Sequence, residues 1–360
     1  MGAEDRDDIT ALTLPDVWAE HQLFGFSGMD GEVSLDDAAV GTTLGDRAGF
    51  VFHDGSGWDD EELKSLSVAV EVDGRPCNVV PKCGHRAVCS DFVDITLFGD
   101  DTLLVRAVFV TWRDGDILGR VTAESQDHRS PSDRVRAFVV CSSDRATRVI
   151  GDSKRLLIES PRQYLEMTGC LTETWMSDSY DTLRQITCSP ASYNGPESVK
   201  YVCLELALEK TSGNALHCDF RFRIAKQLDT VAEAPSLESE YEKKLGYYQA
   251  LPRPCVRNDD EHRAFLKACS ALKVNVCSPQ GKIPCRWTTP DRWPHRYMWL
   301  WDSAFHAMGY RHINGGVAED AVRAALHTQE DSGYIPMAFE PTGNFNVTFG
   351  STPGIAGTVT

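Results

Sequence analysis

The pattern of apolar and polar residues changes near residue 236. Before that point, apolar residues alternate with polar ones over short runs, which is typical of half-buried strands. The dipeptides Asp73-Gly74 and Asp114-Gly115 interrupt this pattern, and Asp-Gly between two alternating runs predicts a hairpin turn. One or two helical turns are expected at 160–168. The expected strands cover 66–72, 103–112, 117–123, 135–141, 199–208 and 217–225.

After residue 236 the apolar residues recur with the helical period. Ser236 is a candidate N-cap, with Glu residues in the first turn and Lys residues later, as the helix dipole favours. Asn258 or Asp259 begins a second helix that carries apolar residues on one face. Two more helices are expected at 298–312 and 316–329.

These patterns predict three segments. Residues 1–230 form an antiparallel β-sandwich, 231–257 a linker helix, and 258–360 the beginning of an all-α domain. The last stretch of about 30 residues reads as loop, which is unusual for a compact domain. We therefore expect the all-α domain to be incomplete, as in a fragment or a truncated gene model.

The charge distribution bears on partners and location. The formal net charge of the 360 residues is −17, and residues 1–62 hold 16 Asp and Glu against two Arg. Nucleic-acid binding needs clustered Lys and Arg, so we expect no nucleic-acid partner. The N-terminus lacks an apolar leader, and no apolar run approaches the ~20 residues of a membrane span. A cytoplasmic protein with no membrane partner is expected, whereas the oligomeric state stays open.

The twelve Cys residues do not predict a metal site. Cys77, Cys83 and Cys89 recur every six residues, but no CxxC pair occurs and no fourth ligand is evident. Scattered reduced thiols explain the count better. No metal and no cofactor are expected.

Candidate chemistry lies in RWPHRYMWLWDSAFHAMGYRH, residues 292–312. If this stretch is helical from 298, then Trp299, Asp302 and His306 share a face and Phe305 lies beside it. Sugar sites combine an aromatic plane, which stacks on the sugar ring, with a carboxylate that binds adjacent hydroxyls. The alternative is that the Trp residues pack in a core and that Asp302 caps the helix or pairs with an Arg.

Residues 288–312 and 326–341 together resemble the start of the catalytic domain in glycoside hydrolase family 63 and in mannosylglycerate-hydrolase-type and trehalase-type enzymes. The pattern W-x-W-D-S-x-F-H is followed by Q-x-x-x-G-x-I-P, which matches residues 329–336. The resemblance implies an (α/α)6 barrel, and the preceding β-sandwich fits the N-terminal domain that such enzymes often carry.

The resemblance also implies site residues. Asp302 would bind sugar hydroxyls in the −1 subsite, and Trp299 and Trp301 would form part of its wall. Gln329 and Tyr334 would approach the same pocket.

Three further residues have a less definite place. Arg292 and His295 would shape the loop before the helix, either structurally or by contact with substrate. His306 would contact substrate or pack against the next helix.

Enzymes of this family invert the anomeric configuration with one carboxylic acid and one carboxylate. In the family both lie downstream of the W-D-S helix, so we expect the catalytic acid and base beyond Thr360 and no activity from this chain alone. Glu340, in a loop, is the strongest candidate within the chain. The expected substrate of the whole protein is a small α-linked glucoside or mannoside. A phosphorylase of the same barrel class, a non-catalytic sugar-binding module and a fragment that does not fold stably remain alternatives.

Overall fold

In the computed structural model, the described residues are 24–25, 39–44, 47–52, 64–77, 86–88, 91–113, 116–125, 130–146, 148–151, 154–159, 164–169, 171–177, 192–193, 199–211, 214–225, 233–252, 254–279, 281–290, 297–341, 343 and 345–346.

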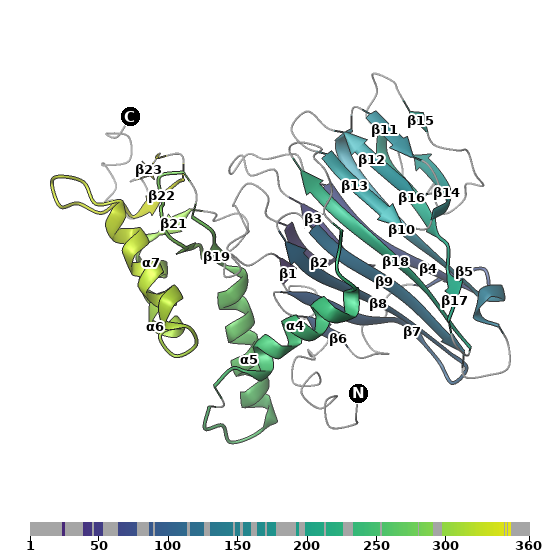
Figure 1. Ribbon diagram of the computed structural model, residues 1–360, viewed down its shortest axis with the longest axis horizontal. Coiled ribbons are helices and arrows are strands. Elements are labelled where there is room, and N and C mark those ends of the chain that lie inside the picture. Colours follow the sequence, from purple (N-terminus) through teal and green to yellow (C-terminus); the bar gives the residue numbers. More distant parts are fainter. Residues whose placement is uncertain are drawn as a thin grey trace.

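Two large antiparallel sheets dominate the first two thirds of the chain (Figure 1). The first has the strand order β1-β2-β3-β4-β10-β16-β14, with β5 paired to β4. Its strands are β1 (Phe24–Gly25), β2 (Ala39–Leu44), β3 (Arg47–Phe52), β4 (Lys64–Val72), β5 (Arg75–Cys77), β10 (Val135–Ala146), β14 (Leu171–Ser177) and β16 (Val199–Leu206).

The second sheet has the order β15-β11-β12-β13-β18-β9-β8-β7-β6, with β17 paired to β18. Its strands are β6 (Arg86–Val88), β7 (Phe92–Gly99), β8 (Leu103–Arg113), β9 (Asp116–Ser125), β11 (Arg148–Gly151), β12 (Arg155–Glu159), β13 (Tyr164–Gly169), β15 (Ser192–Tyr193), β17 (Glu209–Lys210) and β18 (Ala215–Ala225).

The two sheets share one hydrophobic core. Alternate residues of each strand point into it, because successive side chains of a strand lie on opposite faces. In β8 this alternation runs through Leu103, Val105, Ala107 and Phe109, each 0% exposed, and Val110 and Thr111 near the end of the strand are also buried. Those of the first sheet include Val68, Val70, Val72, Val135, Ala137, Val139, Val202, Leu204 and Leu206.

All six expected strands are present within one to five residues of their expected ends. The helical turn expected at 160–168 is wrong. Residues 164–169 form β13 instead, which pairs with β12 on one side and β18 on the other. Met167 of β13 is 0% exposed and lies opposite Phe222, so partners distant in sequence stabilise the extended form.

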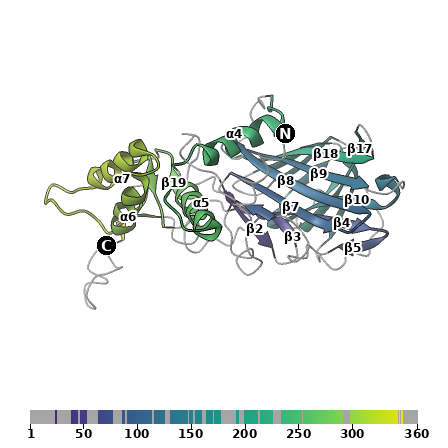
Figure 2. The ribbon, with the colours of Figure 1, turned by 90° about the horizontal axis from the view of Figure 1, so that it is seen from below.

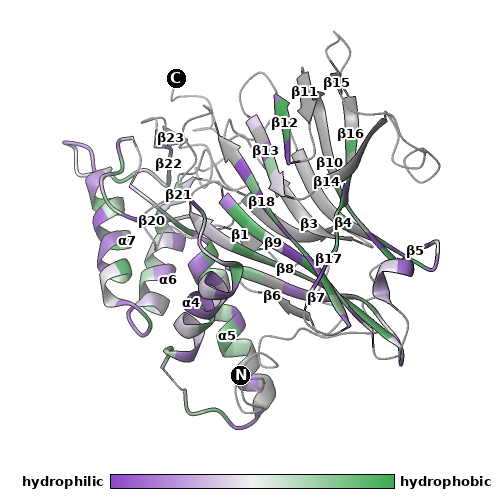
Figure 3. Cartoon of the chain, turned by 45° about the vertical axis from the view of Figure 1, so that its right-hand side comes forward, coloured by the Kyte–Doolittle hydropathy of each residue, from purple (hydrophilic) through white to green (hydrophobic). Residues whose placement is uncertain are grey.

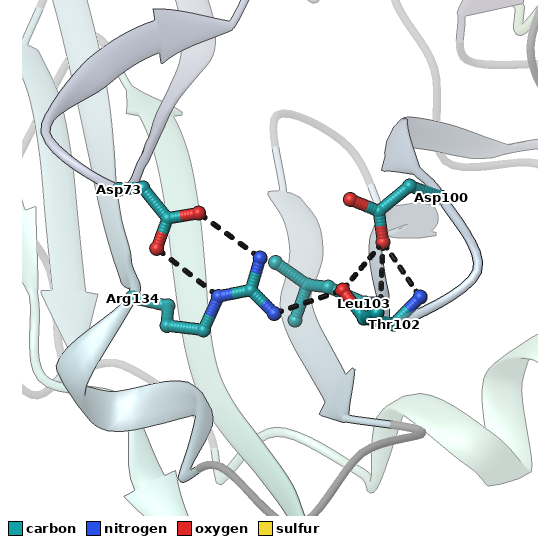
Figure 4. Close-up of polar contacts among 5 residues, drawn as sticks. All are labelled: Asp73, Asp100, Thr102, Leu103 and Arg134. Atoms are coloured by element: carbon teal, nitrogen blue, oxygen red, sulfur yellow. Dashed lines mark hydrogen bonds and ion pairs between the residues drawn. The ribbon is translucent and has the colours of Figure 1, made fainter.

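Arg134 joins one end of the two sheets (Figure 4). Its guanidinium donates to both carboxylate oxygens of Asp73 in the β4–β5 turn, at 3.1 and 3.0 Å, and to Thr102 Oγ1 in the β7–β8 turn, at 3.0 Å. Asp100 in turn accepts hydrogen bonds from the Thr102 and Leu103 amides, each at 2.7 Å. Burial raises the pKa of Asp100, but these hydrogen bonds outweigh it and hold the pKa below its ordinary value. Both connecting turns are thereby fixed in position.

The helices follow the sheets. Helix α4 (Leu237–Gln249) lies on the outer side of the second sheet, across β8 and β9 (Figure 2). Its neighbour α5 (Asp259–Val274) leads away toward α6 (Leu300–Tyr310) and α7 (Gly315–His327). Figure 3 shows the mixture of hydrophilic and hydrophobic residues along α4, which has one side on the sheet and one toward solvent.

The expected N-caps of the first two helices are confirmed. The Ser236 side chain accepts from the Ser239 amide at 3.2 Å, and Asn258 Oδ1 accepts from the Glu261 amide at 2.9 Å. These bonds satisfy amides that have no partner within the helix. No helix in the described ranges is both long and apolar enough to cross a membrane.

Candidate functional site

The W-x-W-D-S motif lies at the junction of a short strand and a helix. Met298 and Trp299 form β21, and α6 begins at Leu300. Trp299 has extended backbone angles (φ −99°, ψ 131°) and occupies the N-cap position without a side-chain capping bond. The Leu300 amide donates instead to Met337 O at 2.9 Å. A neighbouring main-chain segment therefore sets the start of the helix.

The neighbouring segment belongs to the second motif. Residues 329–336 lead directly into β22 (Ala338–Phe339), which pairs with β21 and with β23 (Phe345–Asn346). In this register Trp299 lies opposite Ala338. Strand β21 at the start of the first motif and β22 just after the second, about forty residues apart in sequence, are thus joined by hydrogen-bonded main chains at the start of α6.

A second pair of short strands and a side-chain hydrogen bond also contact α6. Strands β19 (Val276–Cys277) and β20 (Trp287–Thr288) pair with each other, and Thr288 Oγ1 donates to Ser303 Oγ at 3.3 Å. Ser303 is 1% exposed, and Trp287 is fully buried with its indole N–H donating to Ser278 O at 2.9 Å. Ser303, next to Asp302, is thereby fixed on the protein side of the helix.

Asp302 and His306 lie one turn apart on α6 and interact electrostatically. Asp302 is half-buried in the first turn, where the helix dipole favours a negative charge. Burial lowers the pKa of His306, and the nearby Asp302 charge opposes that shift only in part. Within the described residues, His306 Nδ1 is buried without a hydrogen-bond partner. The imidazole is therefore neutral near pH 7 and adds no positive charge beside Asp302.

Large apolar side chains of α6 face outward. Trp301, Phe305 and Met308 are 62%, 63% and 62% exposed, whereas Ser303, Ala307 and Tyr310 face inward. Trp301 and Phe305 lie one turn apart and flank Asp302 along the helix. The exposed surface at the start of α6 therefore combines two aromatic rings with one carboxylate.

Gln329 and Tyr334 lie in the tight loop before β22. The Gln329 side chain donates from Nε2 to Gly333 O at 2.9 Å, and the Glu330 backbone amide donates to Tyr334 O at 2.8 Å. These bonds close the loop on itself and leave the Tyr334 ring 46% exposed. Tyr334 lies four residues before Ala338, which pairs with Trp299. The pairing of β22 with β21 therefore places this loop near Trp299 in the fold.

One expectation from the sequence is wrong in detail. Trp299 does not share a helical face with Asp302 and His306, because it lies in β21 and is only 8% exposed. The difference arises from β22, which is distant in sequence and pairs with β21. On α7, Asp320 pairs with Arg286 at 2.6 Å, and Glu319 pairs with Arg323, one turn away, at 3.4 Å.

Other candidates lie elsewhere or outside the described residues. Arg292 and His295 fall outside them, as do Cys83 and Cys89. Glu340 is half-buried directly after β22. Within the described parts of the chain, no group of three or more His, Cys, Asp or Glu residues is arranged to hold a metal ion.

The sequence did not point to the Thr288–Ser303 contact or to the β21–β22 pairing. Both link short segments that lack strand periodicity of their own. The one available signal was the recurrence of two family-like motifs at a fixed separation, which indicates a common site but not the main-chain pairing that forms it.

Comparisons with known proteins agree with this placement. Residues 295–356 match the family model described as the mannosylglycerate hydrolase MGH1-like glycoside hydrolase domain. The family resemblance of this segment is confirmed. A search of curated proteins finds no match. The MGH1-like segment contains α6, α7 and β21 to β23.

Solved structures provide a second comparison. A bacterial glucoamylase complexed with acarbose matches with a TM-score of 0.57 and 12% identity over 93% of this chain and 54% of that chain. At this identity the likeness concerns the fold, and this chain spans about half the length of that enzyme. The heparan sulfate lyase HepC from Pedobacter heparinus matches with a TM-score of 0.34 and 9% identity over 61% of this chain and 39% of that chain. The family model and the likeness to the glucoamylase support a β-rich part followed by helices of a glycosidase-like fold.

Proposed function

We propose that this chain carries the sugar-binding part of an inverting exo-glycosidase that hydrolyses a small α-linked glucoside or mannoside. In this proposal a β-sandwich precedes the first helices of an (α/α)6 barrel. The observation that carries it is the pairing of β21 with β22, which brings the W-D-S helix and the Q-x-x-x-G-x-I-P segment to one place in a segment of MGH1-like sequence.

The chemistry of this surface suits a sugar. The apolar face of a pyranose stacks on an aromatic ring, and Trp301 is 62% exposed beside Asp302. A carboxylate accepts hydrogen bonds from two adjacent hydroxyls, and charged hydrogen bonds are stronger than neutral ones. Because His306 is neutral, it does not compete with sugar hydroxyls for the Asp302 carboxylate. We assign Trp299, Trp301, Asp302, Gln329 and Tyr334 to substrate binding.

Asp302 is assigned to binding and not to proton transfer. An inverting enzyme needs an acid and a base separated by roughly 6.5–9.5 Å, with a water molecule between the base and the sugar. We assign neither role within the described residues.

Titration calorimetry tests the proposal directly, with acarbose and mannosylglycerate as probes. We expect binding of at least one of them to the unmodified chain, and an affinity loss of about tenfold or more for Asp302→Asn, because hydrogen bonds to charged groups contribute about 1.5–3 kcal/mol each. The control is Glu319→Gln, which makes the same chemical change on α7 at a carboxylate whose side chain is 70% exposed.

Two results would contradict the proposal. Equal affinity of Asp302→Asn and the unmodified chain would remove Asp302 from the site. If a preparation of the whole protein hydrolyses the probe, NMR of the first sugar product must show the opposite anomer, and retention of configuration would refute inversion.

A further inference from the structure

A buried charge cluster lies where the second sheet meets α4 and α5. Asp91, immediately before β7, is 1% exposed. Lys273 of α5 donates to its Oδ1 at 2.7 Å, and Lys244 of α4 lies 3.9 Å from the same oxygen. Tyr248 of α4 donates its hydroxyl to Oδ2 at 3.1 Å. One carboxylate of the β-rich part thus contacts both helices.

Asp91 is itself fixed to the sheet. Its carbonyl oxygen accepts from the Thr111 amide at 2.8 Å and from Thr111 Oγ1 at 3.1 Å. The next residue, Phe92, is fully buried, and its ring lies 4.8 Å from that of Tyr241 on α4. The main chain at Asp91 is therefore fixed to the sheet, which limits the positions that its carboxylate can take against the two helices.

The end of α5 connects this cluster to the candidate site. Lys273 is in the last turn of α5, and Val276, three residues later, pairs with Thr288. Thr288 in turn donates to Ser303, the neighbour of Asp302. A continuous series of hydrogen bonds and chain links thus leads from Asp91 to the first turn of α6.

Apolar packing along α5 also connects the β-rich part to α6. Leu266 and Cys269 of α5 belong to the core of the two sheets, whereas Leu272 packs in a separate cluster with Val276 and Tyr310. A single helix therefore contributes to both cores. Its orientation on the sheet determines where the second core, and with it α6, is placed.

We propose that Asp91 is a positioning residue that fixes the end of α5, and through it the site helix α6, on the β-rich part. In this arrangement the β-rich part sets the geometry of the sugar-binding surface. The inference concerns the fold, and it holds whichever ligand the surface binds.

Hydrogen exchange followed by mass spectrometry tests this role. In Asp91→Asn we expect amides of residues 266–310 to exchange at least about tenfold faster, while those of β8 and β9 remain unchanged, because local opening is cheaper than global unfolding. Tyr248→Phe removes one hydrogen bond and keeps the charges, so it should produce a smaller change at the same residues. The control Glu205→Gln disrupts the exposed Arg136–Glu205 pair on the first sheet and should leave 266–310 unaffected.

A double variant distinguishes positioning from general stability. Asp91→Asn leaves the Lys273 ammonium buried without its carboxylate, which is strongly unfavourable. Asp91→Asn combined with Lys273→Met removes the closest ion pair but leaves the buried Lys244 without this carboxylate and α5 without its contact to Asp91. Exchange at 266–310 should therefore stay at least about threefold faster than in the unmodified chain, whereas full recovery would overturn the proposal, because the unpaired Lys273 charge alone would then explain the effect of Asp91→Asn. Equal acceleration in 103–125 and 266–310, or no acceleration in either variant of Asp91, would overturn the proposal.

Discussion

The turn at Gly281 offers a sharp test of how the strands beside the site are held. Gly281 has φ +54°, and a Cβ at this residue would lie 2.1 Å from Pro341 O. The adjacent Lys282 amide donates to that same oxygen at 2.8 Å. Pro341 follows β22, so the contact links the 281–282 turn to the strand that lies beside Trp299.

The expected cost of Gly281→Ala can be worked from these contacts. A left-handed backbone costs a residue with a Cβ about 1–2 kcal/mol. The 2.1 Å approach forces the two turns apart, which breaks the Lys282–Pro341 hydrogen bond and costs about 0.5–1.5 kcal/mol more. We expect a loss of about 1.5–3.5 kcal/mol in the free energy of unfolding.

Two other glycines separate the cost of the left-handed backbone from the cost of the steric clash. Gly74 has φ +73° but a Cβ there would meet nothing within 4 Å, so Gly74→Ala should cost only the backbone term of about 1–2 kcal/mol. Gly246 lies inside α4 with similar open space, so Gly246→Ala should stabilise by about 0.5–1 kcal/mol. Urea unfolding followed by tryptophan fluorescence measures all three. The reasoning fails if Gly281→Ala is no more destabilising than Gly74→Ala.

Four further predictions concern single side chains. Asp302→Asn should lower the pKa of His306 further, as measured by NMR titration of the imidazole, and an unchanged or higher pKa would contradict their coupling. Because the folded pKa of His306 lies below its ordinary value of 6.5, the unfolded chain binds the proton more readily, and the free energy of unfolding should decrease as pH falls through about 6.5. At pH 8 a thiol reagent should modify exposed Cys255 in the folded chain but reach Cys269, whose pKa burial raises to about 11, only on unfolding; equal rates would refute this. Trp301→Ala should change the free energy of unfolding by no more than about 0.5 kcal/mol in urea titrations, because the ring is 62% exposed, and a larger loss would show that it packs in a core.

Features that depend on local sequence could be predicted. Ser236 and Asn258 cap their helices through amides three residues ahead, so the whole interaction lies within one short stretch of sequence. The β4–β5 turn is similar: Asp73 and Gly74 have φ of 51° and 73°, as the dipeptide predicts for a two-residue hairpin.

Features that depend on distant partners could not be predicted. β13 is extended because β12 and β18 pair with it on both sides, and β18 lies about fifty residues away. Helix α6 begins at Leu300, two residues later than the periodicity suggests, because Met298 and Trp299 pair with β22. The same long-range pairing brings the two motifs together. Residue type and spacing could therefore suggest Trp299, Asp302 and His306 as candidates, whereas Gln329 and Tyr334 could be suggested only through the family resemblance.

The side chains of α6 divide into a buried face and an exposed face. Spacing alone places apolar residues on most sides of α6, which would normally indicate a buried helix. In the structure Ser303, Ala307 and Tyr310 face the protein, whereas Trp301, Phe305 and Met308 face outward and are all more than 60% exposed. The small Ser303 side chain lets the first turn of α6 approach Thr288, which donates to it at 3.3 Å, and the outward residues form an apolar patch of the kind that marks interaction surfaces. In the proposed function, Asp302 and the Trp301 ring of this patch supply the carboxylate and the aromatic plane that sugar recognition needs.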